Sequence, residues 1–294
     1  MYILGHRGEI LPHTQDSYEN SLNAIRKGVK FSDGIECDVC KTQDGELIVI
    51  HEARCAYDSV EYCLAENLDK ASAAQVGERT LSEISSKEAM TLRLKNGEPI
   101  PFLDDVLDVF SHQPNKLLNI ELKGIGVALD VLKAVHRCIG AGLMTIDQFL
   151  ISSFDHHAVY EVKKADHLGI KLGLLFLRED QPTQTIMHPW VGQEISSAIY
   201  PNFSIENLNS DIAQKVDPDV IIIPEPTLVG DNVHLIHEYF PNAKIATWIF
   251  SEIQNDQSSH IETKIVDLKG KGVLEAVIID DPEKTTKKLR ALGA

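Results

Sequence analysis

Short apolar runs alternate with amphipathic segments along most of this chain. Runs typical of strands buried on both faces recur eight times: at residues 2–5, from residue 34 onward, and at 118–122, 149–152, 172–176, 220–223, 245–248 and 276–279. Helical patterns separate most of them, at 127–139, 156–167, 207–216, 228–240 and 260–269. Eight alternating strand–helix units predict an α/β fold, a closed (β/α)8 TIM barrel. An open doubly wound sheet is the alternative, and no Gly-rich dinucleotide fingerprint supports it.

The first third of the chain departs from this rhythm. A helix is predicted from Asp16 to Ile25, closing on Gly28 as a glycine C-cap. Residues 53–116 are irregular, with helical pieces near 80–94 and 103–110. We interpret residues 53–117 as an inserted capping region in a barrel formed by residues 1–52 and 118–294. Residues 178–205 are longer than a normal loop and are expected to cap the barrel mouth.

The stretch from Gly34 to His51 reads as a β-hairpin that carries acidic residues. Glu36 and Asp38 stand two apart in a strand-like run, so their side chains share one face. Asp44-Gly45 is a strong hairpin turn signal. If those two residues are the whole loop, Asp38 pairs with His51, and two carboxylates and an imidazole come together. The alternative is an ordinary hairpin with its polar face in water.

The barrel prediction places further polar residues at one site, because active sites of this fold lie where the strands end. The residues that end strands there are His6, Arg7, Glu36, Asp38, Glu121, Lys123, Ser153 and Trp248. Converging carboxylates require a cation, and hard oxygen ligands suit Mg²⁺ or Ca²⁺ and not zinc. Two imidazoles can exchange protons near neutral pH, while an arginine and a lysine can bind an anion. The set predicts phosphoryl chemistry.

Composition narrows the class of protein. Hydrophobic residues make up 43% and charged residues 24%, as in a soluble globular protein. The formal net charge of −16 argues against nucleic-acid partners and against docking on anionic membranes. We expect neither a signal peptide nor a membrane span.

Five cysteines without framework spacing point to a reducing, cytoplasmic location. Cys37 and Cys40 fall on opposite faces of a strand, so we predict no zinc site there.

Several motifs, in order along nearly the whole chain, closely resemble the glycerophosphodiester phosphodiesterase family. They are Gly5-His6-Arg7-Gly8, Glu19-Asn20-Ser21-Leu22, Glu36-Cys37-Asp38 with Asp44-Gly45, Ile50-His51-Glu52, Pro99-Ile-Pro101-Phe-Leu-Asp-Asp-Val-Leu107, Ile120-Glu-Leu-Lys123, Ser153-Phe154, Trp248 and Ile278-Ile-Asp-Asp-Pro282. The resemblance implies a phospholipase C-like phosphodiesterase barrel with a small domain inserted after the hairpin that carries the second histidine.

Carried over residue by residue, the resemblance implies a role for each matching position. General acid–base catalysis falls to His6 and His51. Divalent-metal binding, by Mg²⁺ or Ca²⁺, falls to Glu36, Asp38 and Glu121. Substrate contacts fall to Arg7 and Lys123 at the phosphate and to Trp248 at the alcohol, although Trp248 also fits a packed barrel-top aromatic. Glu19 is a supporting residue that orients Arg7 or the metal shell. Four further histidines without motif support (His13, His156, His157 and His167) are expected on the surface.

The implied reaction is metal-dependent hydrolysis of a glycerophosphodiester to glycerol 3-phosphate and an alcohol, a step of lipid and glycerol metabolism. In related enzymes the substrate's own hydroxyl can attack first and give a cyclic phosphate, and both routes stay open. We expect a monomer or homodimer whose partner is a small-molecule phosphodiester.

Two departures from the family lie on late strands: Trp248-Ile-Phe-Ser251 replaces Trp-Thr-Val-Asn, and Ile279 replaces a threonine. The resemblance therefore speaks more strongly for phosphodiester cleavage than for glycerol. Two other hypotheses stay open. One is a lipid phosphodiesterase similar to lysophospholipase D or sphingomyelinase D, and the other is an idle barrel used as a binding protein.

Overall fold

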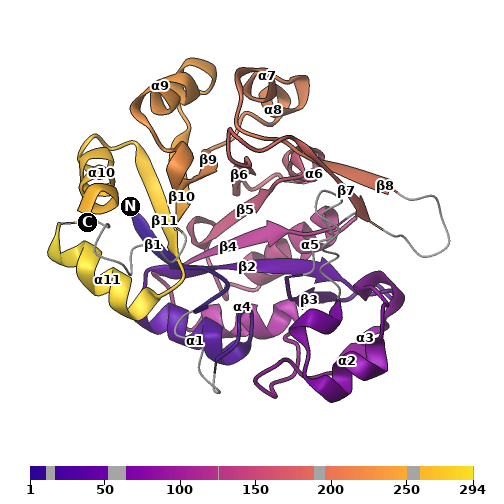
Figure 1. Cartoon of the computed structure of the whole chain (residues 1–294). Helices are drawn as coiled ribbons and strands as arrows, with labels where there is room; N and C mark the ends of the chain where they lie inside the picture. The colour runs from indigo at the N-terminus through magenta and orange to yellow at the C-terminus, as the bar shows by residue number, and fades with distance from the viewer. Residues whose placement is uncertain (11–16, 52–63, 125, 189–195, 250–258, 294) are drawn as a thin grey trace.

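Eight parallel strands form a closed barrel in the computed structural model, which describes residues 1–10, 17–51, 64–124, 126–188, 196–249 and 259–293 (Figure 1). In order around the barrel they are β1 (Tyr2–Gly5), β2 (Gly34–Lys41), β4 (Leu117–Leu122), β5 (Phe149–Ser153), β6 (Lys171–Leu175), β9 (Val220–Pro224), β10 (Lys244–Ile249) and β11 (Leu274–Ile279). Strand β1 pairs with both β2 and β11, which closes the sheet. The predicted TIM barrel is confirmed, with small shifts at strand ends.

Helices surround the barrel on the outside (Figure 1). They are α1 (Leu22–Phe31), α4 (Leu103–Ser111), α5 (Ala128–Gly140), α6 (His156–Ala165), α7 (Ile205–Leu208), α8 (Asp211–Val216), α9 (Gly230–Tyr239), α10 (Ser259–Gly270) and α11 (Pro282–Ala291). The helix predicted at 207–216 is two short helices, because the Ser210 hydroxyl caps α8 by accepting from the amide of Ala213.

The barrel strands separate two hydrophobic layers. Outward-facing residues such as Ile3, Ile35 and Ile120 pack against the helices in the main core. A smaller inner cluster fills the barrel, formed by Leu4, Leu117, Leu150, Leu175, Val220, Ile222, Ala246, Ala276 and Ile278. Because side chains alternate along a strand, polar residues at inward positions above this plug face the mouth of the barrel.

Residues 64–100 gather around a separate hydrophobic cluster beside β3 (Leu47–Val49). Their elements are η1 (Leu64–Asn67), α2 (Lys70–Val76), η2 (Leu81–Glu83) and α3 (Ser86–Ala89). Helix α4 instead buries its apolar face in the main core, through Leu103, Val106, Leu107 and Phe110. The proposed limits of the inserted region, residues 53 and 117, remain predictions.

The prediction of the first helix was wrong at both ends. Helix α1 begins at Leu22, after the N-cap Ser21, and Gly28 lies inside it. Asn20 cannot extend the helix backward, because its φ of 61° is left-handed and its amide donates to the carbonyl of Arg7 (2.8 Å). Asp16 lies outside the described residues.

Gly28 is required by a close approach and not by a helix end. A Cβ placed there would lie 2.5 Å from the carbonyl oxygen of Gly8 and 2.5 Å from Cγ2 of Ile35. Replacing an interior helical glycine by alanine ordinarily stabilises a helix by about 1 kcal/mol. For Gly28→Ala we expect a loss of about 1–3 kcal/mol in the free energy of unfolding, measured by urea denaturation, because of overpacking.

Gly140, at the end of α5, is the matched control, because a Cβ there meets nothing within 4 Å. Gly140→Ala should leave stability unchanged or raise it. Equal gains from both substitutions would contradict the close approach at Gly28.

The register predicted for the hairpin was wrong by one residue. Val39 pairs with Val49, so the loop has three residues, 43–45. The Thr42 hydroxyl accepts from the amide of Glu46 (3.0 Å), and the Asp44 carboxylate accepts from the amide of Ser86 (2.8 Å). These contacts favour the longer loop. The shifted register moves His51 away from the position opposite Asp38, and β3 already ends at Val49. Asp38 and His51 are therefore not a cross-strand pair.

Two further expectations concern the cysteines and the membrane. Cys37 packs in the main core and Cys40 in the smaller cluster, so the two side chains lie on opposite faces of β2, as predicted. No helix within the described ranges is long and apolar enough to cross a bilayer.

Candidate active site

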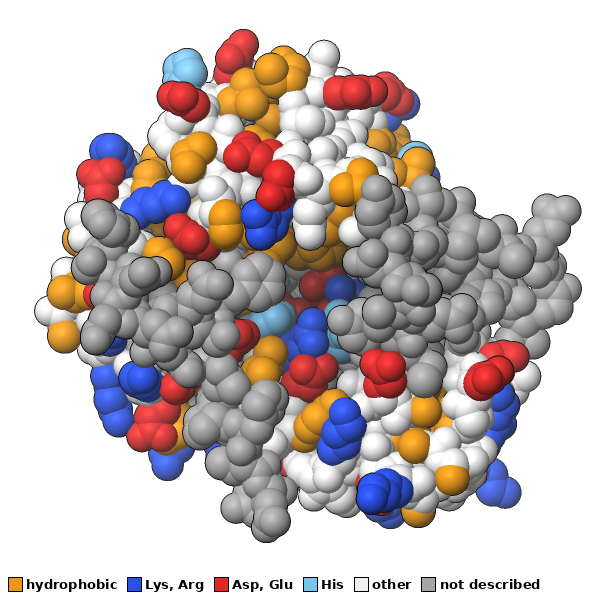
Figure 2. Space-filling view, viewed as in Figure 1, with side chains coloured by type: hydrophobic (Ala, Val, Ile, Leu, Met, Phe, Trp, Pro, Cys, Tyr) orange, Lys and Arg blue, Asp and Glu red, His pale blue; other side chains and the backbone are white. Residues whose placement is uncertain are grey.

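The predicted residues meet at the carboxyl ends of the barrel strands. A cavity of about 330 Å³ opens there, and its polar lining includes His6, Arg7, Glu36, His51, Glu121 and Lys123. In Figure 2 acidic, basic and histidine side chains gather at the floor of a central hollow. Glu36 and Glu121 lie in β2 and β4, and the other four follow the ends of β1, β3 and β4 within two residues.

Three buried carboxylates form the centre of the site. Glu36, Asp38 and Glu121 each offer an oxygen, and these atoms lie within 4.8 Å of one another. The register of the sheet produces this cluster, because Asp38 pairs with Glu121 across β2 and β4 and Glu36 stands two residues before Asp38. The Glu36 Oε1 atom is buried without a hydrogen-bond partner in the described part of the chain. Clustered carboxylate oxygens of this kind are hard ligands that fit a divalent cation.

The electrostatics of the cluster are those of crowded acids. Burial, followed by the charges of Asp38 and Glu121, raises the pKa of Glu36 well above its usual value. Burial also raises the pKa of Glu121. Burial opposes ionisation of Asp38 as well, but the positive charges of Lys123 and Arg7 help to hold the pKa of Asp38 below its usual range.

Two basic side chains lie directly against these acids. Lys123 contacts the carboxylate of Glu121 and lies 3.4 Å from Asp38, Nζ to Oδ1. Arg7 lies 3.2 Å from Asp38, Nε to Oδ2, and donates to Glu19 at 2.9 Å. Glu19 therefore contacts Arg7, one of the two positions foreseen for it. The two basic side chains are outnumbered by the carboxylates around them. The remaining negative charge favours binding of a further cation.

The backbone at Arg7 is held in an unusual conformation. Its φ is 50°, and Gly8 follows at 84°. This turn brings the amide of Arg7 to Glu36, to which it donates at 3.0 Å. A non-glycine residue in the left-handed region carries strain that the surrounding contacts must hold in place.

Asn20 is a site residue that the sequence analysis missed. Its side-chain amide donates to Asp38 Oδ2 (3.0 Å), and its carbonyl oxygen accepts from the Asp38 amide (3.3 Å). It is fully buried. Its place beside Glu19 in a matching motif was a usable signal, because asparagine tolerates a left-handed φ better than other non-glycine residues.

The two histidines lie in different surroundings at the cavity. The Nδ1 atom of His6 lies 2.8 Å from Asp280 Oδ1, and its Nε2 atom lies 3.9 Å from Glu36 Oε2. Burial, followed by the charge of Arg7, lowers the pKa of His51 well below its usual value, so the ring is neutral near pH 7. The side-chain amide of Asn67, in η1, donates to the backbone carbonyl of His51 (2.9 Å) and so holds the backbone of His51 in place.

An apolar wall faces the charged floor. Phe154 packs edge-on against Trp248, with ring centroids 5.7 Å apart, and stacks on Tyr200 at 5.1 Å. The Lys123 ammonium lies 5.6 Å from the Phe154 ring centroid. Trp248 thus lines the cavity and packs in the barrel top at the same time. Phe250 and Ser251, the departures next to it, lie outside the described residues.

The long segment after β6 reaches the same cavity. It contains the antiparallel strands β7 (Gln184–His188) and β8 (Ser196–Tyr200), and it contributes Arg178 and Gln181 to the lining. Neither side chain belongs to a matching motif, so neither was predicted at the site.

The prediction for His156 was wrong. This side chain is buried between α6 and β6, where Nε2 lies 3.0 Å from the carbonyl oxygen of Leu175, and burial lowers its pKa to about 4. His157 and His167 are exposed, as expected, and His13 lies outside the described residues.

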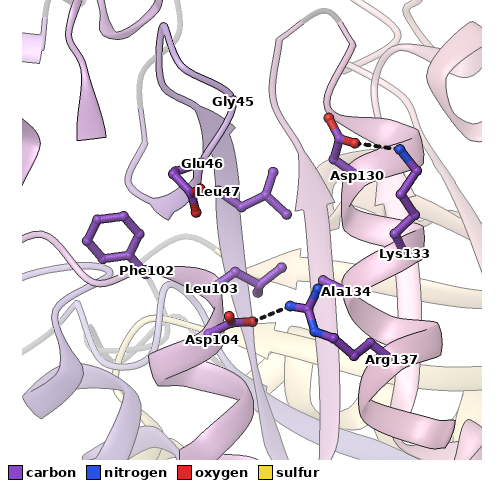
Figure 3. A pocket seen from close by; sticks show the side chains of 10 residues that line it. All are labelled: Gly45, Glu46, Leu47, Phe102, Leu103, Asp104, Asp130, Lys133, Ala134 and Arg137. Carbon is purple, nitrogen blue, oxygen red and sulfur yellow. Dashed lines mark hydrogen bonds and ion pairs between the residues drawn. The ribbon is translucent and has the colours of Figure 1, made fainter. Parts of the chain in front are cut away.

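A second hollow, of about 190 Å³, lies outside the barrel between the β2–β3 turn, α4 and α5 (Figure 3). Its two basic residues already pair with two of its acids: Arg137 with Asp104 at 2.8 Å and Lys133 with Asp130 at 3.0 Å. The lining of this hollow does not combine carboxylates, basic side chains and imidazoles as the barrel mouth does.

Comparison with known proteins agrees with this geometry. Residues 6–283 match the model of the glycerophosphoryl diester phosphodiesterase family. A protein of Caldanaerobacter subterraneus subsp. tengcongensis named glycerophosphodiester phosphodiesterase is 31% identical over 185 residues, which cover 59% of this chain and 66% of that protein.

Solved structures show a similar fold. A putative glycerophosphoryl diester phosphodiesterase of Agrobacterium tumefaciens superposes with a TM-score of 0.66 at 13% identity, covering 100% of this chain and 98% of its own. A glycerophosphodiester phosphodiesterase of Thermotoga maritima gives a TM-score of 0.61 at 21% identity, covering 97% of both chains. At these identities the likeness concerns the fold alone.

Proposed function

We propose that this chain, which belongs to the glycerophosphoryl diester phosphodiesterase family, hydrolyses glycerophosphodiesters to glycerol 3-phosphate and an alcohol with the help of a divalent cation. The observation that carries the proposal is the cluster of Glu36, Asp38 and Glu121 beside two basic side chains and two imidazoles in one cavity. An idle binding barrel has no use for buried acids that repel one another.

Glu36, Asp38 and Glu121 would hold the cation, and Mg²⁺ and Ca²⁺ both accept such oxygen ligands. The bound ion supplies Lewis-acid polarisation of a phosphoryl oxygen. Asn20 and the amide of Arg7 hold two of these carboxylates in place. The chain's own residues thereby preorganise the site before any ligand arrives.

The remaining polar residues bind the diester and move its protons. Arg7 and Lys123 provide a guanidinium fork and a point charge for the phosphate oxygens. One imidazole, of His6 or His51, accepts the proton of the attacking hydroxyl as the new P–O bond forms. The other returns a proton to the alcohol oxygen as its bond to phosphorus breaks. Water as the attacking group gives hydrolysis directly.

The apolar wall supports a role in holding the alcohol. Phe154 and Trp248 both line the cavity and pack edge-on against each other, so a small carbon chain can pack against their rings. We assign Trp248 to this contact. The opening also includes Arg178 and Gln181, which suit a polar head group.

The test is hydrolysis of glycerophosphocholine, glycerophosphoethanolamine and a lysophospholipid, each with EDTA and with Mg²⁺ or Ca²⁺ added back. We expect release of glycerol 3-phosphate from the first two, loss of turnover with EDTA and recovery with one of the ions.

Other outcomes discriminate between the hypotheses. Turnover that EDTA leaves untouched would rule out the metal site. A preference for the lysophospholipid would indicate a lipid phosphodiesterase, and no cleavage with either ion would indicate a binding protein.

A further inference from the structure

Asp280 has no part in the mechanism above, yet its carboxylate lies directly against the ring of His6. Its Oδ1 atom lies 2.8 Å from His6 Nδ1, and its side chain is 13% exposed. The register of the barrel creates this contact. Gly5 pairs with Ile279 at the ends of β1 and β11, so the residues that directly follow them, His6 and Asp280, lie side by side at the mouth.

The contact determines which ring nitrogen of His6 carries its proton. A carboxylate oxygen can only accept a hydrogen bond, so Nδ1 must be the donor. The Nε2 atom then has its lone pair free on the side of the ring that faces the acid cluster, 3.9 Å from Glu36 Oε2. In a neutral imidazole the partner of one nitrogen sets the tautomer at the other.

We propose that Asp280 is a positioning residue that holds His6 as the Nδ1–H tautomer, so that Nε2 is the atom that exchanges a proton with the substrate. This inference rests on the proposed phosphodiesterase function. The proton moves between His6 Nε2 and a substrate or water oxygen, while the proton on Nδ1 stays with Asp280. Asp280 itself touches no reacting atom.

The first measurement reads the tautomer without any catalysis. Long-range ¹H–¹⁵N correlation spectra of ¹⁵N-histidine-labelled protein distinguish Nδ1–H from Nε2–H, and His6→Asn identifies the His6 signals. At a pH where His6 is neutral we expect Nδ1–H in the wild type. In Asp280→Asn the new amide can donate to Nδ1, so we expect the Nε2–H form to appear.

The second measurement is steady-state kinetics with the ion-loaded enzyme. Asp280→Asn should lower kcat about 10- to 100-fold, the usual cost of losing such a partner, with KM changed by less than about threefold. Asp281→Asn is the matched control. Asp281 accepts from the amide of Lys284 (2.9 Å) as the N-cap of α11, and asparagine caps a helix about as well as aspartate, so this variant should leave Tm, kcat and the His6 tautomer unchanged.

The outcomes separate this inference from the function on which it rests. A wild-type His6 with its proton on Nε2, or an Asp280→Asn enzyme with unchanged kcat, would overturn the role of Asp280. An inactive wild type whose His6 is Nδ1–H would support the contact and refute the phosphodiesterase proposal. Equal losses of kcat in the Asp280 and Asp281 variants would reduce the effect to general destabilisation and also overturn it.

Discussion

Glu36→Gln is expected to abolish divalent-ion binding and to lower phosphodiester turnover by at least about a hundredfold, since a metal ion contributes several kcal/mol to a phosphoryl transition state. Glutamine keeps the size of the side chain but removes the charge from the carboxylate whose Oε1 is buried and unpaired within the described ranges. Turnover is measured with the diester that the wild type cleaves best.

The stability of the metal-free protein should not fall together with turnover in Glu36→Gln. This difference separates a metal-binding role of Glu36 from a structural one. Without metal, Glu36→Gln removes one of three crowded like charges, so the variant should be no less stable than the wild type. At an ion concentration one hundred times Kd the wild type should gain about 2.7 kcal/mol in the free energy of unfolding, and the variant none.

Glu46→Gln is the control for this experiment, because Glu46 is an exposed carboxylate just after the β2–β3 turn. It should retain both turnover and the ion-dependent gain in stability. If Glu36→Gln also retained that gain, the cation would have to bind elsewhere.

His51→Asn should lower kcat by about 10² to 10⁴ while divalent-ion binding persists, because the loss falls on proton transfer and not on the carboxylates. His51 lies at the cavity with a pKa lowered first by burial and then by the charge of Arg7, so a neutral ring faces the substrate. Thermal shift with and without the ion measures binding, and steady-state assays measure kcat.

Combining the change with His6→Asn tests whether the two rings act in one reaction. Groups that work as a unit lose activity non-additively, so the double variant should be less than about tenfold slower than the slower single variant. His157→Asn, on the exposed face of α6, is the control and should retain full kcat. A His51→Asn enzyme within about threefold of the wild type would remove His51 from the mechanism.

The fold could be predicted from the sequence because its signals are local. Each apolar run, such as Val220–Pro224, reads as a buried strand by itself, and a strand–helix rhythm permits few architectures. The positions of Glu36, Asp38 and Glu121 followed from the same rule, because alternation along a strand and the ends of parallel strands decide where such side chains point.

Errors arose where a distant contact overrides a local pattern. The hairpin loop is one residue longer than predicted, and its Asp44 carboxylate accepts a hydrogen bond from the amide of Ser86. Helix α1 begins later than predicted, because the backbone amide of Asn20 donates to the carbonyl of Arg7. His156, which looked like a surface residue, is buried against β6. The residues of the Asp44–Ser86 contact lie 42 positions apart and those of the His156–Leu175 contact 19 apart, and helix and strand periodicity carries no information about which distant residue a side chain will meet.

By itself the amino-acid sequence determined the barrel and the acid cluster, because periodicity and strand ends are properties of neighbouring residues, and the motifs of the family pointed to the two histidines of the proposed site. The tertiary structure alone decided which atoms meet there: Asp280 at His6 Nδ1, Asn20 at Asp38, and Arg178 at the cavity. Those contacts depend on how β1 and β11 close the sheet and on how the loops fold over its mouth. The first of these contacts joins residues 274 positions apart and the second residues 18 apart, and only the packed chain brings them within hydrogen-bond distance.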